Sequence, residues 1–201
     1  MPWLPPGFVT PQRVDLPTGH HLRPIRESDV AIDYPAVMGS RERLWAKYGA
    51  AWGWPPSTMS YEADREDLAR HEAEIAAQET FNYAVLDEDE TELLGCVYID
   101  PPDEDSPPGT EAVASWWVVD AAVGTPLEDA LDGFVPRWLT ETWAFRAVHY
   151  SPRSSQTADM PGLLSPHAYR RTAYASRRVG EEGERCRTRW RACWTPDAAV
   201  R

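Results

Sequence analysis

The sequence is poor in lysine, in cysteine and in long hydrophobic runs. Lys47 is the only lysine among its 20 basic residues. The three cysteines, Cys96, Cys186 and Cys193, are an odd number without CxxC spacing, which argues against a disulfide framework and against a structural zinc site. No apolar stretch approaches the roughly 20 residues that span a bilayer, and the N-terminal residues lack the pattern of a secretory signal. These absences favour a cytoplasmic protein with reduced thiols and no membrane partner.

Positive charge is scarce in residues 1–149. They hold 27 of the 32 acidic side chains but only 10 of the 20 basic ones, and the net charge of the whole chain is −12. Such a body repels a nucleic-acid backbone, so we expect no nucleic-acid partner. The acidic surface either favours a cationic ligand, such as an amine, or serves solubility alone.

Composition divides the chain into three regions. Residues 1–19 are a proline-rich lead-in that we expect to be extended, and residues 20–150 have the patterning of a folded domain. Residues 151–201 form an arginine-rich C-terminal extension with little periodicity apart from a helix predicted over 166–179. This composition is typical of partial disorder, and it also fits translation of a GC-rich gene in a shifted frame.

Within residues 20–150, periodicity and turn signals predict strands that alternate with helices. Along the helix over 61–78 the apolar residues Tyr61, Leu68 and Ile75 are seven apart, which predicts one narrow stripe against a sheet. The strands are expected at 20–26, 81–87, 92–100, 111–119 and 146–150, and the helices at 28–38, 41–48, 61–78 and from 126 onward.

Local signals predict where the first two helices begin and end. Ser28 is the expected N-cap of the first helix, and Pro35 is expected to distort or split it. Ser40 is the expected N-cap of the second helix and Gly49 its end.

The last helix has the clearest start of all. Thr125 is the expected cap, Pro126 stands at the first helical position, and Glu128 completes a capping box. Its apolar residues share one face, which predicts packing on a sheet. Pro136 predicts a kink or a break near residue 132.

The order of these elements resembles the Gcn5-related N-acetyltransferase (GNAT) family. The segments LRPIRESD (22–29), FNYAVLDEDETELLGCVYIDP (81–101) and ASWWVVDAAVGTPLEDAL (114–131) carry the resemblance, which covers residues 20–150. It implies an α/β (α+β) fold: a GNAT-like mixed, mainly antiparallel sheet flanked by helices, with splayed fourth and fifth strands. Acetyl-CoA would enter the gap between them as co-substrate, and the amine of an unidentified small molecule or peptide would attack its thioester.

The resemblance also implies where the cofactor would bind. The pantetheine arm would lie along the end of the fourth strand, at Val118 and Val119. The pyrophosphate would lie on the following turn, at Gly124 and Thr125.

That turn departs from the family's usual pattern of Arg or Gln, two residues, Gly, one residue, and Gly or Ala. Ala121 stands where a side-chain donor is expected, and Pro126 stands where a glycine N–H is expected. Thr125 and Glu128 are also placed to satisfy the first free N–H groups of the helix, and the acids of this turn put negative charge near the phosphate position. We therefore expect weak binding of acetyl-CoA.

The chemistry needs a base for the acceptor amine and an acid for the departing thiolate. Glu111, at the head of the most apolar strand, is the candidate base, unless it is only a solvated carboxylate. Tyr150 is the candidate acid, with His149 as the alternative on the same strand. Trp52 and Trp54 are candidate substrate-binding residues, because flat apolar walls suit an amine acceptor, although such a cluster also fits a minor core under a loop.

Two further alternatives stay open at the level of sequence. A non-catalytic GNAT-fold module that binds a ligand or a protein through an impaired acetyl-CoA site would show the same pattern. The tryptophan-rich composition is compatible with a homodimer. We expect no metal site, since neighbouring His20 and His21 would point to opposite faces of an extended strand.

Overall fold

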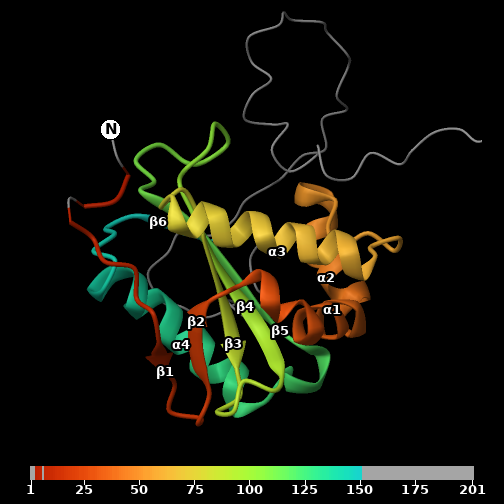
Figure 1. The fold of residues 1–201 in the computed structure, drawn as a ribbon. Helices are drawn as coiled ribbons and strands as arrows, with labels where there is room; N and C mark the ends of the chain where they lie inside the picture. Colours follow the sequence, from red (N-terminus) through yellow and green to blue (C-terminus); the bar gives the residue numbers. More distant parts are fainter. Residues whose placement is uncertain (1–2, 6, 151–201) are drawn as a thin grey trace, which may run out of the picture. The chain divides into compact units, whose positions relative to one another are not determined.

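The computed structural model describes residues 3–5 and 7–150 (Figure 1). The predictions for residues 151–201, including the helix over 166–179 and the state of Cys186 and Cys193, lie outside the described residues. The first element of the structure, β1 (Val14–Asp15), lies within the lead-in that was expected to be extended.

A six-stranded sheet forms the centre of the fold, with its strands in chain order. All neighbouring strands are antiparallel except β5 and β6, which are parallel. The predicted class, a mixed and mainly antiparallel sheet, is therefore confirmed. After β1 the strands are β2 (His21–Pro24), β3 (Phe81–Leu86), β4 (Leu93–Asp100), β5 (Ala112–Val118) and β6 (Val148–Tyr150).

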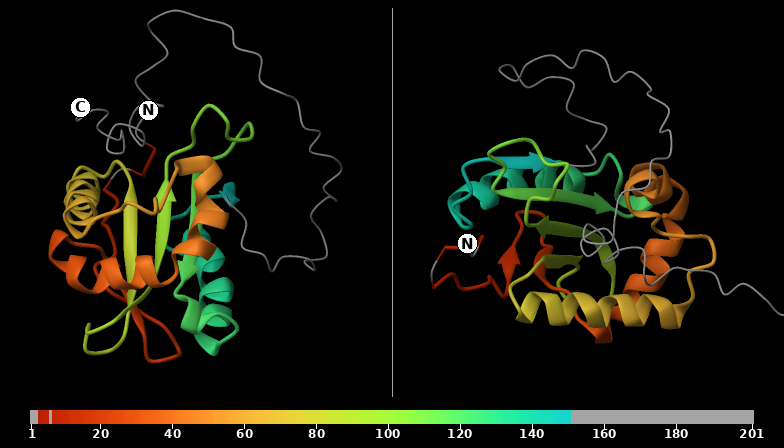
Figure 2. Two further views of the ribbon diagram at one scale, coloured as in Figure 1. Left: turned by 90° about the vertical axis from the view of Figure 1, so that its right-hand side faces the viewer. Right: turned by 90° about the horizontal axis from the view of Figure 1, so that it is seen from above.

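Helices cover both faces of the sheet (Figure 2). The short turn η1 (Glu27–Asp29) leads into α1 (Val30–Gly39), α2 (Arg41–Trp52) and α3 (Tyr61–Ala76), of which α1 and α3 contact β4 and β3. After β5, η2 (Asp120–Ala122) leads into α4 (Pro126–Glu141), whose apolar residues share a core with Val97 and Ile99 of β4. In the part of the chain that the structure describes, no helix is long and apolar enough to cross a membrane.

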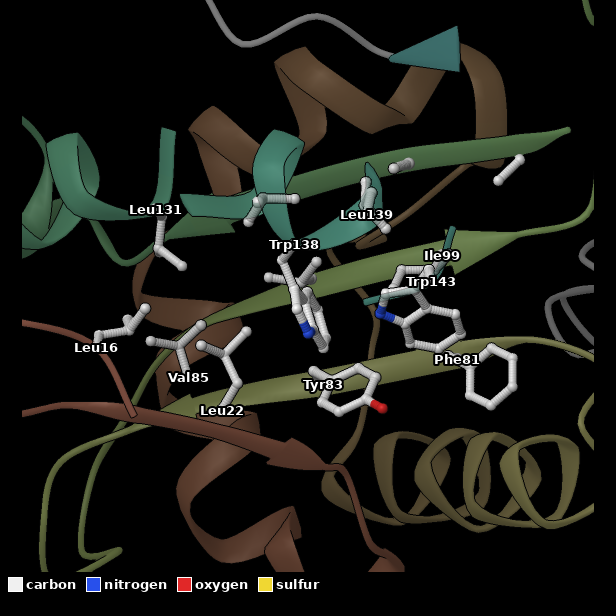
Figure 3. Packing of buried hydrophobic residues seen from close by; sticks show 14 of the residues in the cluster. Leu16, Leu22, Phe81, Tyr83, Val85, Ile99, Leu131, Trp138, Leu139 and Trp143 are labelled. Carbon is white, nitrogen blue, oxygen red and sulfur yellow. The ribbon is translucent and has the colours of Figure 1, made fainter. Parts of the chain in front are cut away.

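The main core lies between α4 and the sheet and is rich in aromatic rings (Figure 3). Tyr83 meets Trp138 edge-on with ring centroids 4.9 Å apart, and Phe81 meets Trp143 in the same way at 4.7 Å. Edge-to-face pairs of this kind add about 0.5–1.5 kcal/mol beyond the area they bury. The aromatic side chains therefore hold α4 against β3.

The lead-in covers one end of this core. Leu4 and Leu16 are buried in it, and Trp3 stacks on Phe145 with ring centroids 5.6 Å apart. Phe8 lies on Trp143 at 4.7 Å. The residues before the predicted domain are thus part of its packing.

α1 and α4 are both continuous, so neither Pro35 nor Pro136 splits its helix; the distortion of α1 and the kink in α4 stay predictions. Pro35 is exposed, and the carbonyl of Ala31 that it leaves without a partner lies on the same exposed side, where water can bond it. In α4 the loss at Pro136 is offset by the burial of Val135, Trp138 and Leu139 on the sheet. One missing hydrogen bond does not outweigh a well-packed face.

The predicted caps of the first two helices also differ from the structure. Ser28 lies exposed inside η1, and α1 begins two residues later. Ser40 makes no side-chain cap for α2; its Oγ instead accepts a hydrogen bond of 3.0 Å from the Asp120 N–H. The second helix runs through Gly49 and ends at Trp52, and Gly53 follows as its C-cap with φ of 66°, the left-handed conformation that favours glycine.

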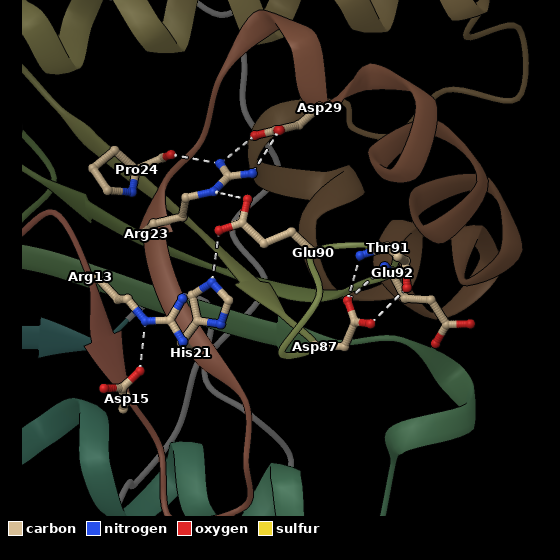
Figure 4. Close-up of polar contacts among 10 residues, drawn as sticks. All are labelled: Arg13, Asp15, His21, Arg23, Pro24, Asp29, Asp87, Glu90, Thr91 and Glu92. Carbon is tan, nitrogen blue, oxygen red and sulfur yellow. Dashed lines mark hydrogen bonds and ion pairs between the residues drawn. The ribbon is translucent and has the colours of Figure 1, made fainter.

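Two residues of the LRPIRESD segment, Arg23 and Asp29, form a buried ion pair (Figure 4). The Arg23 guanidinium donates to both carboxylate oxygens of Asp29, at 2.7 and 2.9 Å, and its Nε donates to Glu90 at 2.8 Å. Arg23 and Asp29 are both buried. His21 Nε2 lies 3.0 Å from the other oxygen of Glu90. This network fastens the start of α1 and the β3–β4 turn to β2.

Substitution of Asp29 by Asn should therefore destabilise the fold strongly, because it leaves the Arg23 charge buried without its bidentate partner. We expect the free energy of unfolding to fall by about 3–5 kcal/mol in urea titrations. The exposed pair of Arg13 and Asp15 supplies the control, and Asp15→Asn should cost less than about 1 kcal/mol. Equal effects of the two substitutions would contradict this account of Arg23.

A second buried polar group joins α1 to α3. The predicted apolar stripe of α3 is correct at Leu68, but Tyr61 is exposed and the buried face also carries Asp64, His71 and Glu74. Burial, with added repulsion from Asp67, raises the pKa of Asp64 to about 7. Burial and the neighbouring charge of Asp64 likewise raise the pKa of Asp33 on α1 well above its usual range. A proton is therefore held between these carboxyl groups in the folded protein at mildly acidic pH.

This proton makes stability depend on pH. Between about pH 4 and pH 7 the folded state binds a proton at Asp64 that the unfolded chain has released, so the free energy of unfolding falls as pH rises through this window. Between pH 5 and pH 8 the free energy of unfolding of Asp64→Asn should therefore fall by about 1–3 kcal/mol less than that of the wild type. Urea unfolding at the two pH values would show it, with exposed Asp89→Asn as the control. Parallel pH profiles for wild type and Asp64→Asn would refute the assignment.

Candidate functional site

The second half of β5 has a free outer edge. On that side Ala112, Val113 and Ala114 pair with the three residues of β6. On its inner side β5 pairs with β4 as far as Val118. Among the described residues, no strand pairs with the outer edge of Ser115–Val118. This is the strand end at which the resemblance implies that pantetheine binds.

Side chains of α2 occupy part of this edge. Lys47 Nζ donates a hydrogen bond of 2.6 Å to the Trp116 carbonyl, and the Tyr48 hydroxyl donates to the same oxygen at 3.3 Å. The Arg43 guanidinium donates to the Val118 carbonyl and, through Nε at 2.7 Å, to Asp120. The two carbonyls that point away from β4 are thus already bonded by cations.

Acidic residues of α4 face these cations. Trp116 Nε1 donates to Asp132 Oδ1 at 2.7 Å, which ties β5 to α4. Burial, with the nearby charge of Arg43, lowers the pKa of Lys47 to about 8, although Asp132 and Glu128 oppose the shift. Burial raises the pKa of Asp132. The free edge therefore carries a small, half-buried set of mixed charges.

The turn after β5 has the backbone shape of a phosphate-binding turn, but Glu128 already bonds one of its N–H groups. Gly124 has φ of 70°, and its N–H donates to Glu128 Oε2 at 2.7 Å. Glu128 thus reaches back from the helix, but to the N–H of Gly124 and not to that of Thr125, so the predicted capping box does not form. Thr125 is the N-cap residue, as predicted, but its side chain does not cap the helix, because its hydroxyl donates to the Ala122 carbonyl at 2.7 Å and accepts no helix N–H.

The start of α4 has N–H groups without a side-chain cap. Since Thr125 does not cap it, the N–H groups of Leu127 and Glu128 meet no acceptor among residues 3–5 and 7–150. Free N–H groups at a helix N-terminus favour an anion. Two other predicted cofactor residues are Val118 and Val119. The side chain of Val118 is buried, and the Val119 N–H donates a hydrogen bond of 2.9 Å to the Leu94 carbonyl.

Glu111 lies at the opposite end of β5. It is exposed, and its Oε2 accepts the Arg146 N–H at 2.6 Å, which joins the start of β5 to the approach of β6. Ala112–Ala114 separate it from the free edge, a distance of roughly 10 Å along a strand. A hollow of 420 Å³ opens beside it, lined by Trp3, Leu4, Pro5, Pro102, Thr110, Glu111, Trp143, Ala144, Phe145 and Arg146.

Tyr150 lies nearer to the free edge. It stands opposite Ala114 at the end of β6 and meets Trp116 edge-on, with ring centroids 5.8 Å apart. Burial raises the pKa of Tyr150, so its phenol is protonated at neutral pH. His149 stands opposite Val113, one residue earlier, and strand alternation turns it to the other face.

Trp52 and Trp54 join a larger aromatic group on the α2 face of the sheet. Trp52 stacks on Tyr48 with ring centroids 4.5 Å apart, and Trp54 meets Tyr48 at 5.7 Å and Trp117 at 6.2 Å. Trp117 Nε1 donates to the Tyr98 hydroxyl at 3.0 Å. Both predicted tryptophans are half-buried, so each presents part of its ring to solvent.

Sequence reasoning missed Arg43 and Lys47. Their partners are the carbonyls of Val118 and Trp116, which lie 75 and 69 positions along the chain, so no local pattern could reveal them. One signal was available: Lys47 is the only lysine in an arginine-rich chain.

Comparison with known proteins adds to this description. No protein-family model matches the sequence, and no curated protein matches it. Among solved structures, RimL, the ribosomal L7/L12 alpha-N-protein acetyltransferase in complex with coenzyme A, aligns with a TM-score of 0.51 and 16% identity, covering 63% of this chain and 67% of RimL. A probable acetyltransferase aligns with a TM-score of 0.51 and 13% identity, covering 69% of this chain and 72% of its own. With its parallel β5–β6 pair in an otherwise antiparallel sheet and these neighbours, the chain has the fold of the Gcn5-related N-acetyltransferases.

Proposed function

We propose that the protein is an N-acetyltransferase that moves acetyl from acetyl-CoA to an amine of a peptide or small molecule. The observation that carries the proposal is the free edge of Ser115–Val118, which leads directly into a turn and a helix start with two unbonded N–H groups. A peptide amine is the favoured acceptor, because RimL, which shares the fold, is described as an alpha-N-protein acetyltransferase.

The residues present fit the cofactor in part. The N–H groups of Leu127 and Glu128 would hold the pyrophosphate, with Gly124 and Thr125 forming the turn. The pantetheine arm would lie along the outer edge of β5 at Val118 and beside Val119, whose own N–H is bonded to Leu94. Glu128 opposes this binding through its charge and its bond to the Gly124 N–H. When bound, acetyl-CoA supplies the activated acetyl group.

The chain's own groups would handle the protons. Glu111 is the proposed base, acting through water because of its distance from the free edge. Tyr150 is the proposed acid, since its half-buried phenol keeps its proton at neutral pH and lies beside Trp116. Trp52 and Trp54 would form the wall against which the acceptor amine is held.

Binding of acetyl-CoA is the first test. Saturating acetyl-CoA should raise the melting temperature of the full chain, because a ligand at 100 times its Kd adds about 2.7 kcal/mol to the free energy of unfolding. No shift, together with no release of CoA in the presence of peptide amines, would leave a non-catalytic GNAT-fold module as the better account.

Glu128→Ala should strengthen that binding. The substitution frees the Gly124 N–H and removes one negative charge, so we expect Kd for acetyl-CoA to fall about three- to tenfold. Asp129→Ala is the matched control, since Asp129 is exposed in the same helical turn and removing it changes the charge alone. A control effect as large as that of Glu128→Ala would show that the bond to Gly124 is not the obstacle.

The proposed proton transfers give a further prediction. With a peptide amine as acceptor, Glu111→Gln should lower kcat about 100-fold or more and leave the melting temperature unchanged, because the amide oxygen still accepts the Arg146 N–H. Tyr150→Phe should lower kcat by about 10-fold or more. Glu111→Ala is the comparison for structure, because it loses both the base and the bond. Full activity in Glu111→Gln would remove Glu111 from the mechanism.

A further inference from the structure

Lys47 carries the single lysine amine of the chain, and that amine lies at the candidate site. It is the only lysine in the chain, and it comes from α2, yet its amine lies on the outer edge of β5. The bond of 2.6 Å to the Trp116 carbonyl fixes the amine on the strand end where the acetyl group would arrive. A lysine that only covered a surface would extend its amine into water instead.

Its surroundings favour the neutral amine more than water does. The side chain is half-buried, the Arg43 guanidinium lies one helical turn before it, and its Nζ is 5.3 Å from the centre of the Tyr48 ring. Burial and the Arg43 charge outweigh the opposing carboxylates of Asp132 and Glu128, so the pKa of Lys47 is about 8. About a tenth of the amine is then neutral at pH 7, against less than about a thousandth for an exposed lysine.

We propose that Lys47 is itself an acyl acceptor, so that the protein acetylates its own α2 helix from acetyl-CoA bound along β5. This inference rests on the proposed function, because it requires acetyl-CoA at the free edge. The neutral Nζ attacks the thioester carbonyl, the carbon–sulfur bond breaks, and an amide bond forms. CoA leaves as the thiolate and takes up the proton that the amine gives off.

The product differs from the starting state in charge and in onward reactivity. An amide does not pass its acetyl group to a second amine, so acetyl-Lys47 is an end state. Its N–H can still donate to the Trp116 carbonyl, but Asp132 and Glu128 lose the cation that faces them. Modification therefore makes the edge of β5 more negative.

The test uses the full chain and acetyl-CoA alone. Acetyl-lysine is followed by peptide mass spectrometry, and Lys47 is the only possible source of the signal. A Lys47→Arg/Arg137→Lys double variant is the matched control, because its single lysine lies exposed on α4. We expect the wild type to be acetylated at least 10-fold faster than this control, and we expect excess CoA to suppress the difference.

The pH dependence gives a second readout. The wild-type rate should rise about tenfold from pH 7 to pH 9 and then level, as the amine faced by Arg43, Tyr48, Asp132 and Glu128 loses its proton. The control rate should continue to rise above pH 9, since an exposed lysine titrates near 10.4.

Four outcomes would overturn the proposal. Equal rates in wild type and control, or acetylation that CoA does not suppress, would show solution chemistry. Stabilisation of the protein by CoA without acetylation of Lys47 would reject self-acetylation and leave the proposed function standing. Absence of stabilisation by either CoA or acetyl-CoA, together with no release of CoA in the presence of peptide amines, would reject both.

Discussion

The free outer edge of β5 is the constraint on which the candidate site depends. A strand with unpaired carbonyls and N–H groups on one side must find partners for them. Here β6 supplies partners over three residues and α2 supplies cationic side chains over the rest. The same groups that stabilise this edge are those that a pantetheine arm would use. Stability and ligand binding therefore compete at the backbone of Trp116 and Val118.

The buried pair of Arg23 and Asp29 has no contact with the β5 edge but helps to position the helices that precede it. It fixes the point where the chain leaves β2 and enters η1, and α1 and α2 follow without a long loop. That start is one constraint on where α2 begins, and the bond of the Asp120 N–H to Ser40, the residue before α2, is another. The network touches no ligand position, so its effect on the site is one of positioning.

Sequence patterns predicted most of the fold and little of the site's detail. The five predicted strands agree with the structure to within two residues at each end, because they are runs of largely buried residues with turn signals between them, and Pro126 marked the start of α4 correctly. The short strand β1 was not predicted. The breaks that the prolines suggested do not occur, because Pro35 and Pro136 stand inside continuous helices. Caps misled where a long-range partner takes the hydroxyl, as Asp120 does at Ser40. The cations on β5 were out of reach, because they depend on contacts between residues about 70 positions apart.

The stacking of Trp3 on Phe145 constrains the order in which the core can form. Trp3 meets Phe81 with ring centroids 5.9 Å apart, but the ring on which it stacks, Phe145, lies about 140 positions further along the chain. Leu4 and Trp143 belong to the same core, so the packing of the lead-in is complete only when the residues that follow α4 are in place. Contacts of such large sequence separation form slowly. The end of the core that the lead-in covers should therefore close late in folding, after α4 has packed on the sheet.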